Sequence, residues 1–181
     1  MIIGITGYIG SGKSTLSNIL KNKGFKIIKA DLIGHKILTN NKVKNKLTKE
    51  FGKNILTKNS IDRNKLGKIV FNNKLKLNKL NKISHPLIFS EIKNIINKSK
   101  NKNIVIEAAI LHKIKLNNLV DKIILINTNK KNIIKRAKNK DKIKSILKNQ
   151  KINKNSDYII SNNKTITHLK KEINKIPFTN L

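Results

Sequence analysis

Short apolar runs bounded by polar turns predict the strands of this chain. Residues 2–6 read Ile-Ile-Gly-Ile-Thr, a run typical of a strand that is buried on both faces of a parallel sheet. Runs of the same kind predict further strands at 25–28, 104–106, 123–126 and 158–160. The strand at 25–28 is expected to end at Ala30 and Asp31, which would then lie at the carboxyl edge of the sheet.

Apolar residues at helical spacing predict helices between these strands. The first helix is expected over 13–23 and should end at Gly24. The other helical stretches are about 32–100, 129–154 and 165–176. Breaks in the first of these stretches are expected at Gly52 and around 84–86. Strands that alternate with helices predict an α/β fold, in which helices cover both faces of a parallel sheet.

The composition bounds the classes of protein to which the chain can belong. Its 181 residues are enough for one domain, and 38 % hydrophobic residues suffice for a buried core. The absence of cysteine excludes a disulfide framework, a thiolate zinc site and a cysteine nucleophile. No apolar run approaches the roughly 20 residues needed to cross a bilayer. Because the first residues resemble a strand entering a turn and not a signal peptide, we expect a cytoplasmic protein.

The chain is strongly basic, with 41 Lys and Arg against 9 Asp and Glu and a formal net charge of +32. A nucleic-acid-binding surface is one interpretation, because lysine neutralises phosphates. However, aromatic residues make up only 4 %, the lysines are spread along the whole chain, and only Arg63 and Arg136 are arginines. Lys, Asn and Ile share A/T-rich codons. The composition therefore favours codon bias over a selected surface for polyanions, and we expect no specific nucleic-acid partner.

The most informative segment is Gly7–Thr15, which matches the phosphate-loop pattern G-x-x-x-x-G-K-[ST] between a strand and a helix. Glycines let consecutive backbone N–H groups converge on an anion, and the following helix adds its positive end. Lys13 would reach the β- and γ-phosphates, and the Ser14 hydroxyl would bind Mg²⁺. The residues expected to bind the nucleotide are Gly10, Ser11, Gly12, Lys13, Ser14 and Thr15. The segment predicts binding of a nucleoside triphosphate.

The phosphate loop alone does not distinguish a GTPase, an ATPase and a kinase. The Asn-Lys-x-Asp motif of GTPases is missing, because Asn127-Thr128-Asn129-Lys130 lacks the aspartate. The small size and the helical stretch after the second strand favour a kinase that acts on a small molecule.

Several further segments carry a pattern that the phosphate loop does not explain. They are Ile28–Asp31, Ile61–Phe71, Ser84–Ile88, Arg136–Asp141, Gln150 and Asp157–Asn162. Together with Thr6–Thr15, these segments resemble, in order and spacing, those of the dephospho-CoA kinase family. The specific part of the resemblance is Asp-Arg followed by Val-Phe within Ile61–Phe71, and His-Pro within Ser84–Ile88.

The resemblance implies a P-loop NTPase-type parallel sheet sandwiched by helices. The core would comprise about 1–34 and 101–181, with a helical acceptor-binding insertion at about 35–100 and a helical lid at about 128–150. The implied reaction moves the γ-phosphoryl of ATP, with Mg²⁺, to the 3′-hydroxyl of dephospho-CoA, the last step of coenzyme A synthesis. We expect a monomer or weak homo-oligomer without a membrane partner. The alternatives are another small-molecule or nucleotide kinase, a basic nucleic-acid-binding NTPase and a non-catalytic relic.

Two acids are candidates for chemistry at the carboxyl edge of the sheet. The resemblance implies that Asp31 orients the acceptor hydroxyl and takes its proton, whereas the sequence alone also allows a helix-capping Asp31. Glu107 ends the strand at 104–106 and is placed to hold Mg²⁺ directly or through water. A solvated acid at a strand end is the alternative for Glu107.

Three basic residues are candidates for substrate contacts. His85 precedes a proline, where histidine more often packs or begins a helix, but the resemblance implies a contact with the acceptor. Because arginine is otherwise absent, Arg63 and Arg136 are candidates for bidentate phosphate contacts that lysine cannot copy. We expect Arg63 in the acceptor pocket and Arg136 on the ATP phosphates, within a lid that excludes water. Salt-bridged structural arginines are the alternative.

The chain also departs from the family pattern. Tyr8 replaces a glycine of the loop, and Lys29 replaces an aspartate before Asp31. Lys113 stands where the family has glutamate, and Lys140 where it has the second lid arginine. These changes bear on substrate contacts, whereas Lys13, Ser14 and Asp31 match the family.

Overall fold

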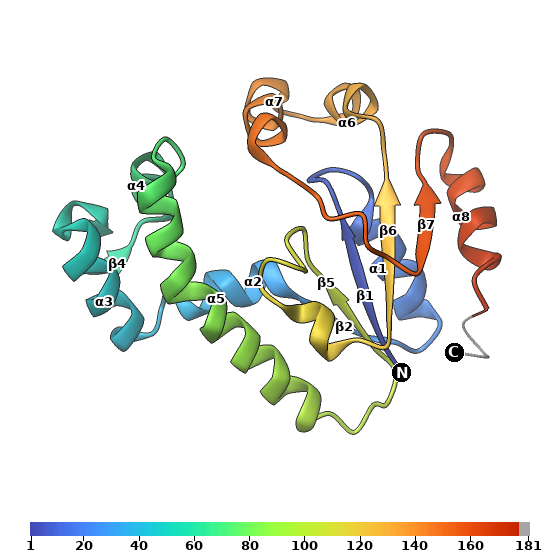
Figure 1. Cartoon of the computed structure of the whole chain (residues 1–181), viewed down its shortest axis with the longest axis horizontal. Coiled ribbons are helices and arrows are strands. Elements are labelled where there is room, and N and C mark those ends of the chain that lie inside the picture. Colours follow the sequence, from blue (N-terminus) through green and yellow to red (C-terminus); the bar gives the residue numbers. More distant parts are fainter. Residues whose placement is uncertain (178–181) are drawn as a thin grey trace. The chain divides into compact units, whose positions relative to one another are not determined.

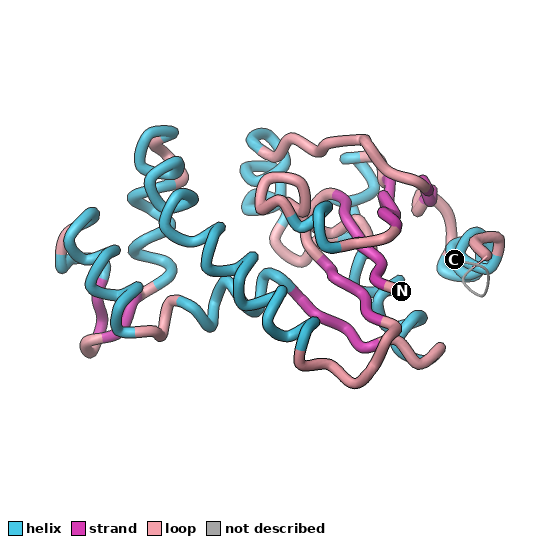
Figure 2. Tube along the Cα trace, turned by 60° about the horizontal axis from the view of Figure 1, so that its bottom comes forward, coloured by secondary structure: helices cyan, strands magenta, loops and turns pink. Residues whose placement is uncertain are grey.

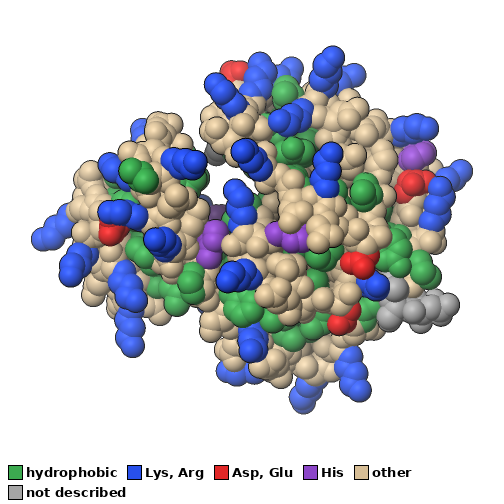
Figure 3. Space-filling view, viewed as in Figure 1, with side chains coloured by type: hydrophobic (Ala, Val, Ile, Leu, Met, Phe, Trp, Pro, Cys, Tyr) green, Lys and Arg blue, Asp and Glu red, His purple; other side chains and the backbone are tan. Residues whose placement is uncertain are grey.

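The computed structural model describes residues 1–177, except for the side chain of Lys142. The chain divides into two compact units. Unit 1 comprises Met1–Lys29 and the chain from Lys98 onward, and unit 2 comprises Ala30–Asn97. Lys and Arg side chains are distributed over both units on the face shown in Figure 3 and do not gather in a single stripe there.

Unit 1 contains a parallel five-stranded sheet. Its strands are β1 (Ile2–Gly7), β2 (Lys26–Lys29), β5 (Ile104–Glu107), β6 (Lys122–Asn127) and β7 (Tyr158–Ser161), in the order β2-β5-β1-β6-β7 (Figures 1 and 2). All five strands predicted from apolar runs are present. Because β1 is central, it has a parallel neighbour on each side and no edge exposed to water.

The core of unit 1 explains why α1 (Lys13–Asn22) forms directly after the loop that follows β1. Leu16 and Leu20 are fully buried against Ile3 and Ile5 of β1. The closing helix, α8 (Ile166–Asn174), contributes to the same apolar cluster. Burial of Leu16 and Leu20 holds α1 against the central strand, and this places the phosphate loop at the start of the helix.

The helical stretch predicted at 129–154 is wrong in its extent. It consists of α6 (Lys130–Arg136) and α7 (Lys140–Asn149), and the segment 150–156 forms no helix. Ala137 adopts an extended backbone after α6, so the chain turns before α7 begins. No glycine or proline marks this turn in the sequence. Figure 1 shows α6 beyond the arrowhead of β6, at the carboxyl edge of the sheet.

Unit 2 is mainly helical. Its helices are α2 (Ala30–Ile37), α3 (Asn41–Phe51), α4 (Arg63–Val70) and α5 (Lys74–Asn97), with a short 3-10 helix, η1, at Lys53–Ile55. Its core contains Val43, Leu47, Ile55, Leu66 and Val70. The break predicted at Gly52 is confirmed, because Gly52 follows α3 with a φ of 86°.

The break predicted around 84–86 is wrong, because α5 continues through Pro86. Proline removes one backbone hydrogen bond from a helix at a cost of about 3 kcal/mol or more. Leu80 and Ile83 before Pro86 pack on the core of unit 2, and Ile92 after it is fully buried. Apolar packing on both sides of the proline offsets the lost bond, which spacing in the sequence does not reveal.

Two local features differ from the sequence prediction near candidate site residues. The chain forms a small hairpin from β3 (Leu56–Thr57) and β4 (Ser60–Ile61), whose turn residues have positive φ angles. In addition, β2 ends at Lys29, so Asp31 is the second residue of α2 and not the end of the strand. Connectivity still places Asp31 two residues after the carboxyl end of β2.

Candidate active site

The loop between β1 and α1 has the backbone of an anion-binding turn. Gly10 has a φ of 72° and Gly12 a φ of 104°, both in the left-handed region that favours glycine. Gly12 precedes α1, and no side chain caps the N-terminus of that helix. The first N–H groups of α1 therefore point towards the loop with the positive end of the helix dipole.

Lys13 lies over this loop and is only 8 % exposed. Its Nζ donates hydrogen bonds to the backbone carbonyls of Gly7 at 3.2 Å and Tyr8 at 2.9 Å. The backbone of the loop thus holds the Lys13 ammonium group at the opening of the loop. A phosphate bound to the loop amides would contact the ammonium group there.

Ser14 and Glu107 meet beside the loop. The Ser14 hydroxyl donates to Glu107 Oε1 at 2.6 Å, and Glu107 is 9 % exposed. Glu107 Oε2 is buried and makes no hydrogen bond. The register of the sheet causes this meeting, because Glu107 is the last residue of β5 and pairs with Ile5 of β1. A hydroxyl oxygen and a carboxylate with one unsatisfied oxygen are ligands that suit a hard divalent cation.

Arg136, the last residue of α6, lies beside the phosphate loop. Arg136 and Gly10 line the same cavity of about 370 Å³, together with Ile9 and Ile133. The guanidinium group donates to the carbonyls of Asn162 at 2.9 Å and Lys164 at 3.1 Å, in the loop after β7. The structure therefore brings Arg136 next to the loop. Within the described residues 1–177, its partners are backbone carbonyls and none is an acid.

The four departures from the family pattern lie at different places. The Tyr8 ring lies 5.4 Å from the ammonium group of Lys130 at the start of α6, so its side chain packs towards that helix. Lys29 pairs in register with Glu107 on the neighbouring strand. The other two lysines are exposed; Lys113 follows β5 and Lys140 begins α7.

In unit 2, Asp62 caps the helix that begins with Arg63. The Asp62 carboxylate caps α4 by accepting from the backbone N–H groups of Asn64 and Lys65, and Arg63 is the first residue of that helix. The pKa of Asp62 is lowered, chiefly by the hydrogen bond from the Lys65 backbone and then by that from the Thr57 hydroxyl. Arg63 lines a cavity of about 430 Å³ with His35 and Lys44.

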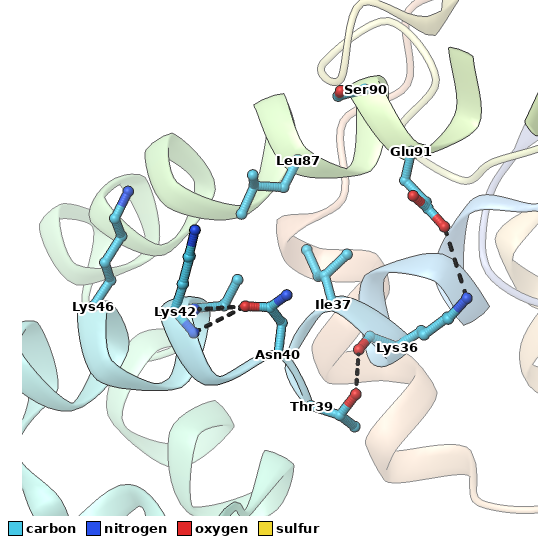
Figure 4. Close-up of a pocket in the computed structure, with 10 residues that line it drawn as sticks. Lys36, Ile37, Thr39, Asn40, Lys42, Lys46, Leu87, Ser90 and Glu91 are labelled. Atoms are coloured by element: carbon cyan, nitrogen blue, oxygen red, sulfur yellow. Dashed lines mark hydrogen bonds and ion pairs between the residues drawn. The ribbon is translucent and has the colours of Figure 1, made fainter. Parts of the chain in front are cut away.

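A second cavity of unit 2, of about 460 Å³, lies between α2, α3 and α5 (Figure 4). Lys42 and Lys46 line it from α3, and Leu87 adds apolar surface from α5. Lys36 and Glu91 also line this cavity, and Lys36 Nζ lies 3.7 Å from Glu91 Oε1. Unit 2 thus offers two basic cavities, while His85 lies half-buried within α5 and Asp31 is exposed on α2.

Three side chains that the sequence did not assign to the site contact the phosphate loop. Thr128 and Asn162 both donate to the Ser11 carbonyl, at 2.9 and 2.8 Å. Gln150 Oε1 accepts from the Ile9 N–H at 3.0 Å. Asn162 and Gln150 belong to segments that resemble the family, but nothing in the sequence says what they contact.

The sheet order, the phosphate loop after the central strand, and the lysine and acid beside it define the P-loop kinase class of phosphotransferases. A shikimate kinase from Bacteroides thetaiotaomicron shares the fold, with a TM-score of 0.57 at 13 % identity over 97 % of this chain and 95 % of that one. No helix in the described part of the chain is long and apolar enough to span a membrane.

The particular family follows from comparison of the sequence. A family model described as dephospho-CoA kinase matches residues 1–168. A dephospho-CoA kinase from Borreliella burgdorferi is 42 % identical over 97 % of this chain and 92 % of its own length. One from Campylobacter jejuni has a solved structure that is 33 % identical with a TM-score of 0.68, covering 96 % of this chain and 94 % of that one. The chain belongs to the dephospho-CoA kinase family.

Proposed function

We propose that this protein transfers the γ-phosphoryl group of ATP to the 3′-hydroxyl of dephospho-CoA, giving coenzyme A and ADP. Family membership names the reaction, and the phosphate loop with Lys13 held at its mouth is the structural observation that carries the proposal. We expect the protein to act in the cytoplasm as a monomer or weak homo-oligomer, without a nucleic-acid partner.

Positioning and charge stabilisation supply most of the catalysis in such a reaction. The loop amides from Gly10 to Thr15 would bind the β- and γ-phosphates, and Lys13 would move from the carbonyls of Gly7 and Tyr8 onto phosphate oxygens. Arg136 is close enough to the loop to share a cavity with Gly10, which supports a contact with ATP. The hydrogen bonds that it donates to the carbonyls of Asn162 and Lys164 hold the guanidinium group beside the loop.

Asp31 is the proposed general base. Its carboxylate would accept the proton of the acceptor 3′-hydroxyl as the oxygen attacks the γ-phosphorus. The support is its place two residues after the carboxyl end of β2, the edge at which open α/β sheets bind ligands. The Asp31 side chain is exposed, so it is accessible to the acceptor.

Ser14 and Glu107 would hold Mg²⁺. The ion would supply positive charge that neutralises the phosphate oxygens as the phosphoryl group moves. The buried and unsatisfied Glu107 Oε2 supports this role, because a buried carboxylate oxygen without a partner costs stability unless a ligand uses it.

The helical insertion would bind the acceptor. Both cavities of unit 2 are lined by lysine, and one by Arg63, so both suit an anionic substrate such as dephospho-CoA. His85 would contact the same substrate. The segment 128–150, which holds α6 and α7, would act as the lid that excludes water from the phosphoryl group.

The direct test is to incubate the purified protein with ATP, Mg²⁺ and dephospho-CoA and to measure coenzyme A and ADP by chromatography. We expect equal amounts of both products, because one phosphoryl group moves in each turnover. Formation of ADP without coenzyme A, stimulated by added DNA or RNA, would instead indicate a nucleic-acid-dependent NTPase and would overturn the proposal.

Replacing Glu107 by glutamine tests the cation site. Glutamine retains an acceptor for the Ser14 hydroxyl but loses the charge, so the apparent affinity for Mg²⁺ should fall by about 10- to 100-fold. The measurement is a titration of Mg²⁺ in the activity assay, with calorimetric binding of ATP in the presence of Mg²⁺ and of EDTA. ATP binding in EDTA should stay unchanged.

The matched control is Glu172→Gln, which neutralises an acid of α8 in the same unit, where it pairs with Lys175 just after the helix. It should leave the Mg²⁺ dependence as in the wild type. A Glu107→Gln protein with the wild-type Mg²⁺ dependence would remove Glu107 from the proposed cation site.

A further inference from the structure

Two side chains that follow neighbouring strands donate hydrogen bonds to the backbone of the phosphate loop. Thr128 follows β6 and Asn162 follows β7. The Thr128 hydroxyl and the Asn162 side-chain amide both donate to the carbonyl oxygen of Ser11. Both side chains are buried, at 2 % and 8 % exposure, so water does not compete for this oxygen. The two donors use both lone pairs of the carbonyl.

A peptide group is planar and trans, so its C=O and N–H point in opposite directions. The Ser11 carbonyl shares its peptide group with the N–H of Gly12. Two bonds that fix the carbonyl towards β6 and β7 therefore fix the Gly12 N–H towards the other side of the loop. Donors on the carbonyl also polarise the peptide, which strengthens its N–H as a hydrogen-bond donor.

Asn162 itself is fixed on both sides of its backbone. Its N–H donates to the Asn127 carbonyl at 2.9 Å, and its own carbonyl accepts from Arg136. Its side chain also lies against Gly12, where a Cβ atom would come within 2.3 Å of Asn162 Nδ2. The buried Ser11 hydroxyl makes no hydrogen bond, so the carbonyl and not the hydroxyl anchors this residue.

We propose that Thr128 and Asn162 are positioning residues for phosphoryl transfer, which orient the Ser11–Gly12 peptide so that the Gly12 N–H donates to a phosphate of the bound nucleotide. The proposal rests on the proposed function, since it names how the same loop is kept ready for ATP. Neither residue would touch the substrate. The residues that directly follow β6 and β7 thereby set the direction of an amide that glycine alone would leave free to rotate.

The test compares Thr128→Val with Thr128→Ser. Valine has the shape of threonine but no hydroxyl, whereas serine keeps the donor. The dissociation constant of ADP should rise by about 10-fold in Thr128→Val and stay near the wild-type value in Thr128→Ser. Adenosine, which has no phosphate, should bind all three proteins equally. In Thr128→Val combined with Asn162→Ala, the affinity for ADP should fall by about 100-fold.

The control variant is Asn163→Ala, which removes an asparagine one residue away that bonds to the Asn129 N–H and not to the phosphate loop. It should bind ADP as the wild type does, and thermal unfolding should show that every variant is folded. If Thr128→Ser loses as much affinity as Thr128→Val, packing and not donation is responsible, and the proposal is wrong. If folded Thr128→Val and the double variant both bind ADP normally, it is also wrong.

These outcomes differ from a failure of the proposed function. In that case the wild-type protein would bind ADP but form no coenzyme A from dephospho-CoA. A second readout is the amide proton shift of Gly12, labelled with nitrogen-15. It should move downfield when ADP binds to the wild-type protein and to Thr128→Ser, and move less in Thr128→Val. An equal shift in all three proteins would overturn the proposal.

Discussion

Replacing Lys13 by methionine is expected to lower kcat/KM for ATP on the order of 10³-fold. Lys13 is the only lysine within the loop Gly7–Thr15, and its ammonium group would neutralise charge that develops on the γ-phosphoryl group. Methionine keeps an unbranched stem of similar length but has no charge. The measurement is steady-state formation of ADP and coenzyme A at several concentrations of ATP.

The structure also indicates what must be controlled in this experiment. The Lys13 ammonium bonds to the carbonyls of Gly7 and Tyr8, so its loss could disturb the loop itself. Thermal unfolding of the variant should therefore be compared with that of Lys21→Met, an exposed lysine on the same helix, α1. Lys21→Met should keep wild-type activity. A folded Lys13→Met protein with wild-type kcat/KM would contradict the assignment.

Replacing Asp31 by asparagine is expected to lower kcat by about 10²- to 10⁴-fold, while KM for ATP stays unchanged. Asparagine retains the size of the side chain and can still accept a hydrogen bond, but it cannot take the proton of the acceptor hydroxyl. Because the substitution leaves the phosphate loop intact, ATP binding should not change. The measurement is kcat with saturating dephospho-CoA, with ATP binding measured separately by calorimetry.

The matched control for Asp31 is Glu50→Gln. Glu50 is an exposed acid of the same unit that pairs with Lys79 at its surface. Loss of this charge should leave kcat as in the wild type, which would show that the net charge of the unit does not set the rate. An Asp31→Asn protein with the wild-type kcat would remove Asp31 from the role of general base.

The phosphate loop and the strands of the sheet could be predicted because their signals are local. Residues 2–15 contain an apolar run, glycines at the turn and a helix start within a few residues of one another. The backbone of an anion site needs a glycine at position 12, and the lysine that follows supplies positive charge for the anion. The same reasoning placed Glu107 at the end of its strand, where the structure also has it.

The errors arose where packing overrides local preference. Pro86 lies inside α5 because Ile83 and Ile92 hold the helix on both sides of it. The turn at Ala137 carries no glycine or proline, so the helical stretch predicted at about 129–154 contained no sign of the break between α6 and α7. Asp31 belongs to α2 and not to the end of β2, since the chain enters the helix without an intervening loop.

The sequence by itself determined the class of fold, the phosphate loop and the family, because apolar periodicity and glycine spacing act over a few residues. Only the tertiary structure decided which distant side chains reach that loop. Ser14 and Glu107 form a hydrogen bond although they lie 93 residues apart in the sequence. Ser11 and Asn162, which lie 151 residues apart, form another. The sheet order β2-β5-β1-β6-β7 creates these contacts. An apolar run predicts that a strand exists, but its neighbours depend on how all the strands and helices bury their surfaces together.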